Sequence, residues 1–410
     1  MDLLSKKTLH DVDVTNKTVI VRFDFNCPVK DGIVTSDKRI RAALPTIKFL
    51  LEKNCKIVAL SHLSRIKTLD DIKSNKKSLE PVAKKLQEIL PDVKVKFEPS
   101  TDFINVENAV KGMQSKEILV LQNTRYYDVD PEGVVNKLES KNNSELAKFW
   151  AGLGDVFVND AFGTAHRAHA SNAGIASIVK DSCVGFLVEE ELTKILKAIN
   201  DPTRPYVAIL GGAKVSDKLK VINNLLPNAD KIIICGGMAY TFHKALGQDI
   251  GHSLLEEDMV PVAKEIMEKG KDKIVLTEDC VCNKAFEDTP GQVIEFGQPF
   301  NGLEGLDIGP KSIAKFQNAL NGAKTVVWNG PAGVFEFKNY ANGTKSIIEK
   351  LIEITKQGAY TLIGGGDSAA SITALGFNEN DFSFVSTGGG ASLALIEGSD
   401  LVGLAPIKNK

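Results

Sequence analysis

Arginine is scarce in this sequence and is confined to its first half. Only seven of the 50 basic residues are arginine, and none follows position 204, although lysine is plentiful throughout. The seven are Arg22, Arg39, Arg41, Arg65, Arg125, Arg167 and Arg204. A guanidinium presents several N–H donors in a rigid planar fork that matches the oxygens of a carboxylate or phosphate. The amino-terminal half is therefore predicted to bind a small anion through side chains, although a bias toward lysine codons combined with chance is an alternative explanation.

Glycine shows the opposite distribution. Of the 34 glycines, 26 lie beyond position 204. Many form clusters: Gly211-Gly212, Gly236-Gly237, Gly364-Gly365-Gly366 and Gly388-Gly389-Gly390. Because glycine has no Cβ, such clusters let backbone N–H groups approach phosphate oxygens closely. The carboxyl-terminal half is therefore predicted to hold a nucleotide with its main chain.

Short apolar runs alternate with amphipathic stretches along the whole chain, and the alternation predicts the elements that position these groups. The expected strands are 18–24, 56–60, 117–121, 206–210, 231–235, 273–276, 325–328 and 360–363, and helical periodicity is clear at 39–53 and 79–90. Nearly continuous apolar strands alternating with helices are typical of parallel sheets covered on both faces. The fold class is therefore α/β, with two doubly wound, Rossmann-like parallel-sheet domains. Ligands of such sheets bind at the carboxyl ends of the strands, where most of the arginines and glycine clusters lie.

A chain of 410 residues exceeds what one hydrophobic core usually organises, so two domains are expected. The amino-terminal, anion-binding domain is predicted to span residues 1–184, and the carboxyl-terminal, nucleotide-binding domain residues 201–397. Between them, residues 185–200 are predicted to form a hinge helix that ends before Pro202 and Pro205. Two such halves joined by one helix are predicted to form a cleft that opens and closes.

Composition excludes several classes of protein. A net charge of −2, with 25% charged and 43% hydrophobic residues, lacks the broad basic surface of a nucleic-acid binder. No apolar run is long enough for a membrane helix and no signal peptide is visible, so a cytosolic protein is expected. The six cysteines show no zinc-type or redox spacing, since Cys280 and Cys282 are separated by one residue. They are predicted to be buried, reduced thiols.

Six segments, in this order, resemble the successive signatures of phosphoglycerate kinases. They are Arg22–Pro28 (RFDFNCP), His62–Arg65 (HLSR), Gly163–His169 (GTAHRAH), Gly211–Lys218 (GGAKVSDK), Trp328–Glu336 (WNGPAGVFE) and Gly364–Ser368 (GGGDS). The resemblance runs from about residue 8 to the end. It implies reversible phosphoryl transfer from 1,3-bisphosphoglycerate to Mg-ADP, giving 3-phosphoglycerate and ATP in glycolysis, by a cytoplasmic monomer. It also implies that residues 398–410 pack back onto the amino-terminal domain.

The resemblance further implies roles for residues at matching positions. Asp24, Asn26, Arg39, His62, Arg65, Arg125 and Arg167 would bind the glycerate or its phosphates. Lys214, Lys218, Gly236, Gly309, Asn329, Glu336, Gly365, Gly366, Asp367 and Ser368 would bind the nucleotide. The catalytic groups would be Arg39, Lys214, Lys218, Gly366 and Gly389, and Asp367 would be the Mg²⁺ ligand. Ser64 and Ile66 depart from the family pattern, which leaves the conformation of the loop after His62 open.

The implied chemistry explains these residue types. An acyl phosphate has a carboxylate leaving group, so no base has to remove a proton, and catalysis depends on alignment and charge stabilisation. Arg39, Lys214 and Lys218 supply such charge. His62, His166 and His169 have a plainer interpretation as structural polar residues, and Arg41 and Arg204 are expected to be surface and structural charges respectively.

Two alternatives remain open from the sequence. A kinase acting on another carboxylate, such as acetate or aspartate, would account for the nucleotide half but not for the clustered arginines. A non-catalytic nucleotide sensor or scaffold on the same fold is expected to have lost at least one of Arg39, Lys214, Lys218 or Asp367. All four are present, which favours an enzyme.

Overall fold

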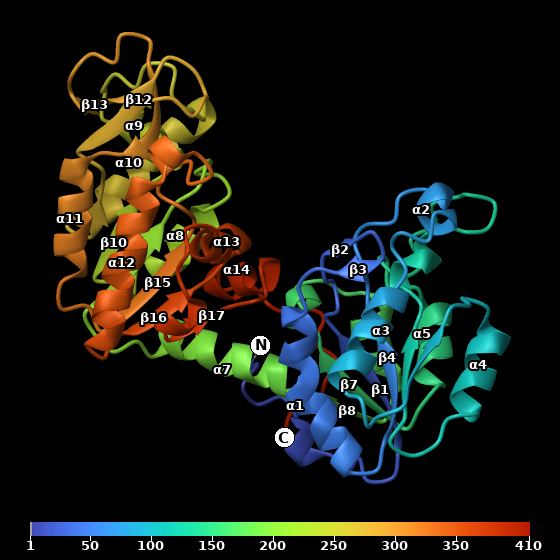
Figure 1. Cartoon of the computed structure of the whole chain (residues 1–410). Helices are drawn as coiled ribbons and strands as arrows, with labels where there is room; N and C mark the ends of the chain where they lie inside the picture. Colours follow the sequence, from blue (N-terminus) through green and yellow to red (C-terminus); the bar gives the residue numbers. More distant parts are fainter. Residues whose placement is uncertain (1) are drawn as a thin grey trace. The chain divides into compact units, whose positions relative to one another are not determined.

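The computed structural model describes residues 2–410, which divide into two compact units (Figure 1). The first unit runs to Thr193 and also includes Asp400–Lys410, and the second unit is Lys194–Ser399. The boundary falls inside one helix, α7 (Phe186–Asn200). This helix covers the segment that the sequence predicts as a hinge.

The first unit is built on a parallel sheet. Its elements are η1 (Leu9–Asp11), β1 (Thr18–Phe23), β2 (Val29–Lys30), β3 (Ile33–Val34), α1 (Lys38–Glu52), β4 (Lys56–Leu60), α2 (Leu69–Lys73), α3 (Glu80–Ile89), β5 (Val95–Glu98), α4 (Phe103–Lys111), β6 (Ile118–Leu121), η2 (Thr124–Asp128), α5 (Ser144–Ala151), β7 (Val156–Asp160), η3 (Phe162–Thr164), η4 (Ala170–Gly174), α6 (Ile175–Ile178) and β8 (Asp181–Val184). Six strands pair in the order β5-β6-β4-β1-β7-β8, all parallel, and β2 and β3 form a separate hairpin.

Helices cover both faces of this sheet. On one face, α1 packs Ile40, Ile47 and Leu50 into the core, and α3 adds Val82 and Leu86. The apolar positions recur at helical spacing, which gives each helix one buried side. Figure 1 shows α1 and α3 on one side of β1 and β4, with α4 and α5 on the other. With both faces covered, the strand ends are the places where polar side chains reach solvent.

The last residues of the chain pack against the first. The Lys7 N–H donates to the Lys408 carbonyl at 2.9 Å, and the Lys6 ammonium donates to the carbonyls of Ala405 and Ile407 at 3.1 and 2.5 Å. Leu401, Leu404 and Ile407 are buried. The buried apolar side chains and the backbone bonds together fix this tail to the first unit.

The second unit contains two sheets. Its elements are β9 (Tyr206–Leu210), α8 (Leu219–Leu225), β10 (Lys231–Ile234), α9 (Met238–Ala245), η5 (Glu257–Met259), α10 (Val260–Lys269), β11 (Ile274–Val275), β12 (Asp279–Asn283), β13 (Gln292–Glu295), β14 (Glu304–Ile308), α11 (Pro310–Leu320), β15 (Thr325–Asn329), η6 (Lys338–Tyr340), α12 (Asn342–Lys356), β16 (Tyr360–Ile363), α13 (Gly366–Ala374), η7 (Glu379–Asp381), β17 (Phe384–Val385) and α14 (Gly390–Ile396). The parallel sheet has the order β11-β10-β9-β15-β16-β17, and a three-stranded antiparallel sheet has the order β13-β12-β14.

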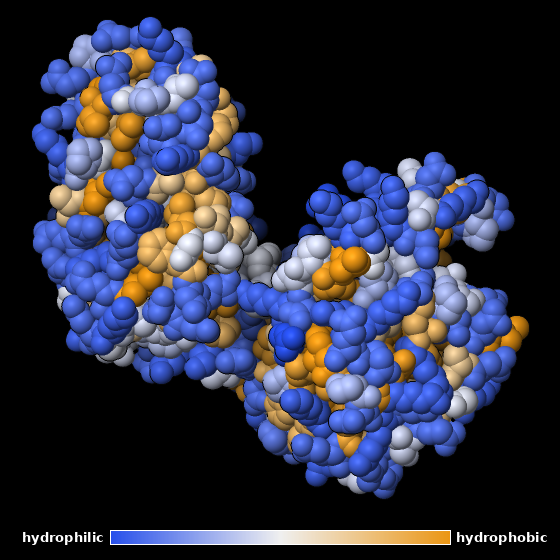
Figure 2. All heavy atoms as spheres, viewed as in Figure 1, coloured by the Kyte–Doolittle hydropathy of each residue, from blue (hydrophilic) through white to orange (hydrophobic). Residues whose placement is uncertain are grey.

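The two six-stranded parallel sheets confirm the predicted α/β class. The antiparallel sheet was not predicted, and neither was β7, which lies beside β1. Cys280 and Cys282 lie on β12 and are buried, as are the other four cysteines, and all six are free thiols, as expected. Within residues 2–410 no helix is long and apolar enough to span a membrane, and the face shown in Figure 2 is mostly hydrophilic with scattered apolar groups.

Candidate active site

The predicted anion-binding residues of the first unit lie at the carboxyl ends of neighbouring strands. Asp24 follows β1, is 7% exposed, and forms an ion pair with Arg39 near the start of α1. Gly163 allows this approach, because a Cβ there would lie 2.6 Å from Asp24 Oδ2 and 3.7 Å from Arg39 Nη1. Arg39 keeps 34% of its side chain exposed, so it retains a face for a ligand.

Arg125 and Asn26 hold the loop that follows His62. The Ser64 N–H donates to Asn26 Oδ1 at 2.8 Å, and Arg125 Nη1 donates to the Ser64 carbonyl at 2.7 Å. Ser64 has a φ of +58°, a conformation that favours glycine. The sequence left this loop open because serine stands at a position where the family usually has glycine. The structure shows that the loop makes a left-handed turn at Ser64 and that both the N–H and the carbonyl of Ser64 are hydrogen-bonded.

His62 is buried, at 6% exposure, and its Nδ1 lies 3.2 Å from Arg22 Nη2. Burial lowers the pKa of His62 well below its usual range, and the charges of Arg22 and Arg125 lower it further. Arg22 itself is only 1% exposed. Arg22 was not among the residues predicted to bind the substrate, although it is a charged residue inside an otherwise apolar strand.

Arg65 and Arg167 complete the arginine group as exposed side chains. Neither guanidinium makes a hydrogen bond or ion pair with any other residue in the described part of the chain. Burial lowers the pKa of Arg125, and the positive charges of Arg167 and Arg65 lower it further. The three arginines therefore act on one another, and an anion placed among them would relieve the repulsion.

The second unit presents a glycine-lined cavity of about 250 Å³ at the ends of β15 and β16. Its lining residues are Lys218, Asn329, Gly330, Gly365, Gly366, Asp367, Ser368, Gly389, Gly390 and Leu393. The Lys218 ammonium donates to Asn329 Oδ1, and Asn329 Nδ2 donates to the Gly364 carbonyl at 2.7 Å. Gly365, with a φ of +97°, turns the chain into α13, whose first N–H groups face an anion favourably.

A second cavity in this unit, of about 360 Å³, is suited to a nucleoside. It contains the predicted residues Gly236 and Glu336, and it shares Asp367 with the smaller cavity. Its larger apolar side chains, Tyr240, Leu254, Phe286 and Leu306, were not predicted. Phe286 is 63% exposed, which is unusual for phenylalanine and gives a planar base an apolar surface to cover.

Two predicted nucleotide residues lie elsewhere. Gly309 lines neither cavity; it stands at the start of α11, where a Cβ would lie 2.3 Å from the Asp279 carboxylate. Gly305 lines the larger cavity instead, and a Cβ on Gly305 would collide with Tyr240. The role of Gly309 in nucleotide binding therefore stays a prediction, and Gly305 is a second candidate from the same short segment. Lys214 is exposed and also lines neither cavity.

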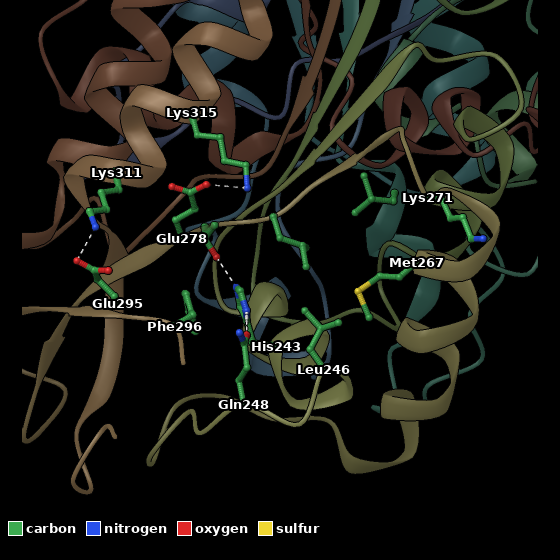
Figure 3. Close-up of a pocket in the computed structure, with 13 residues that line it drawn as sticks. His243, Leu246, Gln248, Met267, Lys271, Glu278, Glu295, Phe296, Lys311 and Lys315 are labelled. Carbon is green, nitrogen blue, oxygen red and sulfur yellow. Dashed lines mark hydrogen bonds and ion pairs between the residues drawn. The ribbon is translucent and has the colours of Figure 1, made fainter. Parts of the chain in front are cut away.

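A third cavity of the second unit, about 520 Å³, contains none of the predicted site residues (Figure 3). His243 lies in its wall between Gln248 at 2.6 Å and Thr277 at 2.7 Å. Burial lowers the pKa of His243 to about 4, so the imidazole is neutral near pH 7. Lys311 pairs with Glu295 and Lys315 pairs with Glu278, so most of the charge in this cavity is already compensated.

No group of three or more histidine, cysteine, aspartate or glutamate residues is placed to hold a metal ion anywhere in residues 2–410. Asp367 is an exposed carboxylate where the two cavities meet. A magnesium ion that is shared with phosphates needs only one or two protein carboxylates. The donor set therefore fits a metal that arrives with a nucleotide and does not fit a metal held by protein alone.

The two parallel-sheet units, one with clustered arginines and the other with a glycine-lined cavity, together with the family match reported next, define the class as a phosphotransferase of α/β fold. The family model described as phosphoglycerate kinase matches residues 9–399. The chain belongs to the phosphoglycerate kinase family.

Individual relatives agree along nearly the whole chain. It is 54% identical to the phosphoglycerate kinase of Mycoplasma pneumoniae, over 98% of this chain and 99% of that protein. It is also 54% identical to the phosphoglycerate kinase of Enterococcus faecalis, over 99% of this chain and 100% of that protein. The solved structure of phosphoglycerate kinase from Coxiella burnetii superposes with a TM-score of 0.85 at 34% identity, covering 98% of both chains.

Proposed function

We propose that this chain catalyses the reversible transfer of a phosphoryl group from 1,3-bisphosphoglycerate to Mg-ADP, giving 3-phosphoglycerate and ATP. One observation carries the proposal. A chain that matches the family over residues 9–399 retains an arginine cluster at the strand ends of one unit and the Lys218–Asn329–Asp367 cavity at the strand ends of the other. We further propose that it works as a cytoplasmic monomer in glycolysis.

The glycerate and its phosphates would bind the first unit. Arg65, Arg125 and Arg167 offer planar donor groups, two of them with no other partner in the described residues. Asp24 and Asn26 supply oxygens that accept from a hydroxyl, and Arg39 is held beside Asp24 by their ion pair. Several donors of fixed geometry around a small, multiply charged molecule favour this substrate over a simple carboxylate such as acetate.

ADP or ATP would bind the second unit. The apolar wall of the larger cavity fits the base, and Glu336 can accept hydrogen bonds from both ribose hydroxyls. The phosphates would lie in the smaller cavity, beside Lys218 and the backbone of Gly365, Gly366 and Gly389. Burial lowers the pKa of Lys218, while Asp217 and Asp367 act to raise it. Lys214 would join these residues from its exposed position.

The chemistry asks the protein for alignment and charge, because the leaving group of an acyl phosphate is a carboxylate and no proton has to be removed. Arg39, Lys214 and Lys218 would stabilise the charge of the transferring phosphoryl group, and the N–H groups of Gly366 and Gly389 would add dipoles at the starts of α13 and α14. A bound Mg²⁺, held by Asp367, would supply further positive charge to the phosphate oxygens.

A coupled assay tests this function directly. The protein is expected to phosphorylate 3-phosphoglycerate with ATP and magnesium, and to leave acetate and aspartate unmodified. Phosphorylation of acetate or aspartate at a comparable rate would favour a different carboxylate kinase. Binding of nucleotide without turnover of any of the three would favour a non-catalytic role.

A further inference from the structure

A buried chain of polar groups lies behind the arginine cluster of the first unit. The Glu139 carboxylate accepts from the Ser171 N–H at 2.9 Å and from the Ser171 hydroxyl at 2.5 Å. Arg22 Nε donates to the same hydroxyl oxygen at 2.8 Å, and Arg22 Nη2 lies 3.2 Å from His62 Nδ1. Glu139 and Ser171 are 0% exposed. The chain therefore connects a fully buried carboxylate to a predicted substrate residue.

The charges in this chain depend on one another. Burial lowers the pKa of Arg22, and the nearby charges of Glu139 and Asp24 oppose that effect. Asp24 is already paired with Arg39. Removing one partner of a buried charged pair leaves the other without compensation, which is strongly unfavourable. Burial raises the pKa of Glu139 and the charge of Arg22 opposes this, so each group compensates the other. Through Ser171, Glu139 therefore holds the Arg22 guanidinium in position.

The contact between Arg22 and His62 fixes the proton on the imidazole. A guanidinium only donates hydrogen bonds, so His62 Nδ1 must accept, and a neutral ring then carries its proton on Nε2. The groups that act on this ring are Arg22 from β1, Arg39 from α1, Arg125 from η2 and His169 just before η4, and all four disfavour a second proton. In residues 2–410, Nε2 has no protein partner and is not among the enclosed unpaired atoms.

We propose that Glu139 is a positioning residue for the glycerate site: through Ser171 and Arg22 it holds His62 as a neutral imidazole whose Nε2–H donates to an anionic oxygen of the substrate. The proposal rests on the proposed function, because it takes the glycerate as the ligand of His62. Glu139 itself does not touch the substrate. Its carboxylate acts by fixing which nitrogen of His62 is a donor.

A purely structural role for Glu139 is the alternative. Its backbone carbonyl accepts from Ala170 N–H at 3.0 Å, and its carboxylate holds Ser171, so the residue also anchors η4. If Glu139 were only a structural anchor, its loss would lower the stability of the protein and weaken the binding of both substrates together. A positioning residue would affect glycerate binding and the protonation state of His62 while leaving nucleotide binding in the second unit unchanged.

The first test measures the imidazole directly in the unmodified protein. Nitrogen-15 NMR of labelled histidine, assigned with His62→Gln, is expected to show His62 protonated at Nε2 and unprotonated at Nδ1 at neutral pH. A ring protonated at Nδ1, or a doubly protonated ring, overturns the proposal. This measurement needs neither substrate nor turnover, so it stands even if 3-phosphoglycerate proves not to be the substrate; that failure would appear separately in the coupled assay.

The second test uses Glu139→Gln, which keeps the size of the side chain and removes its charge. The KM for 3-phosphoglycerate is expected to rise about tenfold, the scale of one unsatisfied buried group, while the KM for ATP stays unchanged. Glu145→Gln is the matched control, because Glu145 is exposed and pairs only with Lys148. Equal changes in both KM values, or no change in either, overturn the proposal.

Ser171→Ala provides a variant that leaves both charges in place. It removes the hydroxyl that joins Arg22 to Glu139, so the KM for 3-phosphoglycerate is expected to rise in the same direction but by less. If Glu139→Gln does not fold, the Ser171→Ala variant and the NMR measurement still test whether this chain of groups positions His62. An unchanged KM for 3-phosphoglycerate in Ser171→Ala, with His62 still protonated at Nε2, would show that the chain does not position His62 and would overturn the proposal.

Discussion

The two units have the same parallel-sheet architecture and present opposite kinds of anion site. In the first unit, charged side chains gather at the strand ends, and some are buried with their counter-charges, as Arg22 is with Glu139. In the second unit, half of the residues that line the cavity at the strand ends are glycines, and only Lys218 and Asp367 are charged. A small, compact anion offers oxygens on all sides and suits converging side chains, whereas a phosphate chain suits a groove of N–H groups.

This difference predicts how each site fails. A side-chain site depends on the shape and charge of individual groups, so it should be sensitive to substitutions that keep the charge and change the geometry. A backbone site depends on close approach, so it should be sensitive to an added Cβ. The following substitutions test that contrast, from the largest expected effect to the smallest.

Arg39→Lys is expected to have the largest effect. Lysine keeps the charge but replaces the planar donor fork with a compact, strongly hydrated ammonium. If Arg39 acts on the transferring phosphoryl group, steady-state kinetics should show turnover lower by roughly 10²–10³-fold, the scale of losing one preorganised donor. The KM for 3-phosphoglycerate should change much less.

Arg41→Lys is the control for this substitution. Arg41 is 60% exposed and pairs with Asp37 at the start of the same helix, so its replacement should be nearly silent. Similar losses for the two substitutions would remove the catalytic role from Arg39. An increase in KM alone for Arg39→Lys would make it a residue that binds the ground state.

Gly236→Ala tests the backbone site of the second unit. Gly236 has a φ of +69°, and a Cβ there would lie 2.7 Å from Gly212 N and 2.9 Å from the Pro331 carbonyl. The left-handed backbone alone costs an alanine about 1–2 kcal/mol, and the collision should also displace the cavity wall. Calorimetry is expected to show ATP binding weaker by about tenfold or more.

Gly247→Ala separates backbone strain from collision. Gly247 has a similar φ of +76°, but a Cβ there would meet nothing within 4 Å. Both variants should lose stability, and only Gly236→Ala should lose ATP affinity. Equal ATP affinities in the two variants would mean that close backbone approach at Gly236 does not matter for the nucleotide.

Asp367→Asn should have a moderate effect, confined to the metal. The substitution keeps the size of the side chain and removes the charge where the two cavities meet. The magnesium concentration for half-maximal rate should rise by about tenfold, the scale of one charged interaction, with 3-phosphoglycerate binding unchanged. Asp258→Asn, at an exposed position outside both cavities, is the control. An unaltered magnesium requirement would contradict the assignment.

The local pattern of apolar and polar residues predicted most strands of the parallel sheets, but not the strands that contain buried polar residues or are only partly buried. Strands such as Lys56–Leu60 and Tyr206–Leu210 were predicted to the residue, because a buried parallel strand is a continuous apolar run. Strand β7 was not predicted because its short apolar run ends in two polar residues, Asn159 and Asp160, which are buried in the structure. The antiparallel sheet was missed because its strands contain cysteine, glycine and aspartate and are only partly buried.

The site residues divide in the same way. Charged residues at strand ends, such as Asp24 and Asp367, were identifiable because their types and positions suggest chemistry. Gly305, Tyr240 and Phe286 line the cavity of about 360 Å³, yet no sequence pattern marks any of them as a site residue. Arg22 and Glu139 are far apart in the sequence and are joined through the Ser171 hydroxyl, so no local pattern connects them.

The smallest expected effect concerns a buried carboxylate of the first unit, Asp160. Its Oδ1 accepts from the N–H groups of Leu187 and Val188, at 3.0 and 3.4 Å. Burial raises the pKa of Asp160 to about 6, although the Thr46 hydroxyl and these N–H groups act to lower it. No charged group is among the causes that shift the pKa of Asp160, so burial has the larger effect.

Asp160→Asn should reveal this as a dependence of stability on pH. Because the pKa is raised in the folded state, the stabilisation from protonated Asp160 is complete below about pH 4 and is lost as the pH rises through about 6. The variant does not titrate at this position. Its free energy of unfolding, minus that of wild type, should therefore increase by about 1 kcal/mol between about pH 5 and pH 8, so the variant becomes relatively more stable. Hydrogen exchange of first-unit amides measures this difference, and any fixed effect of the substitution cancels. A difference that stays constant with pH would mean that Asp160 is already ionised at pH 5 and that its N–H donors outweigh burial.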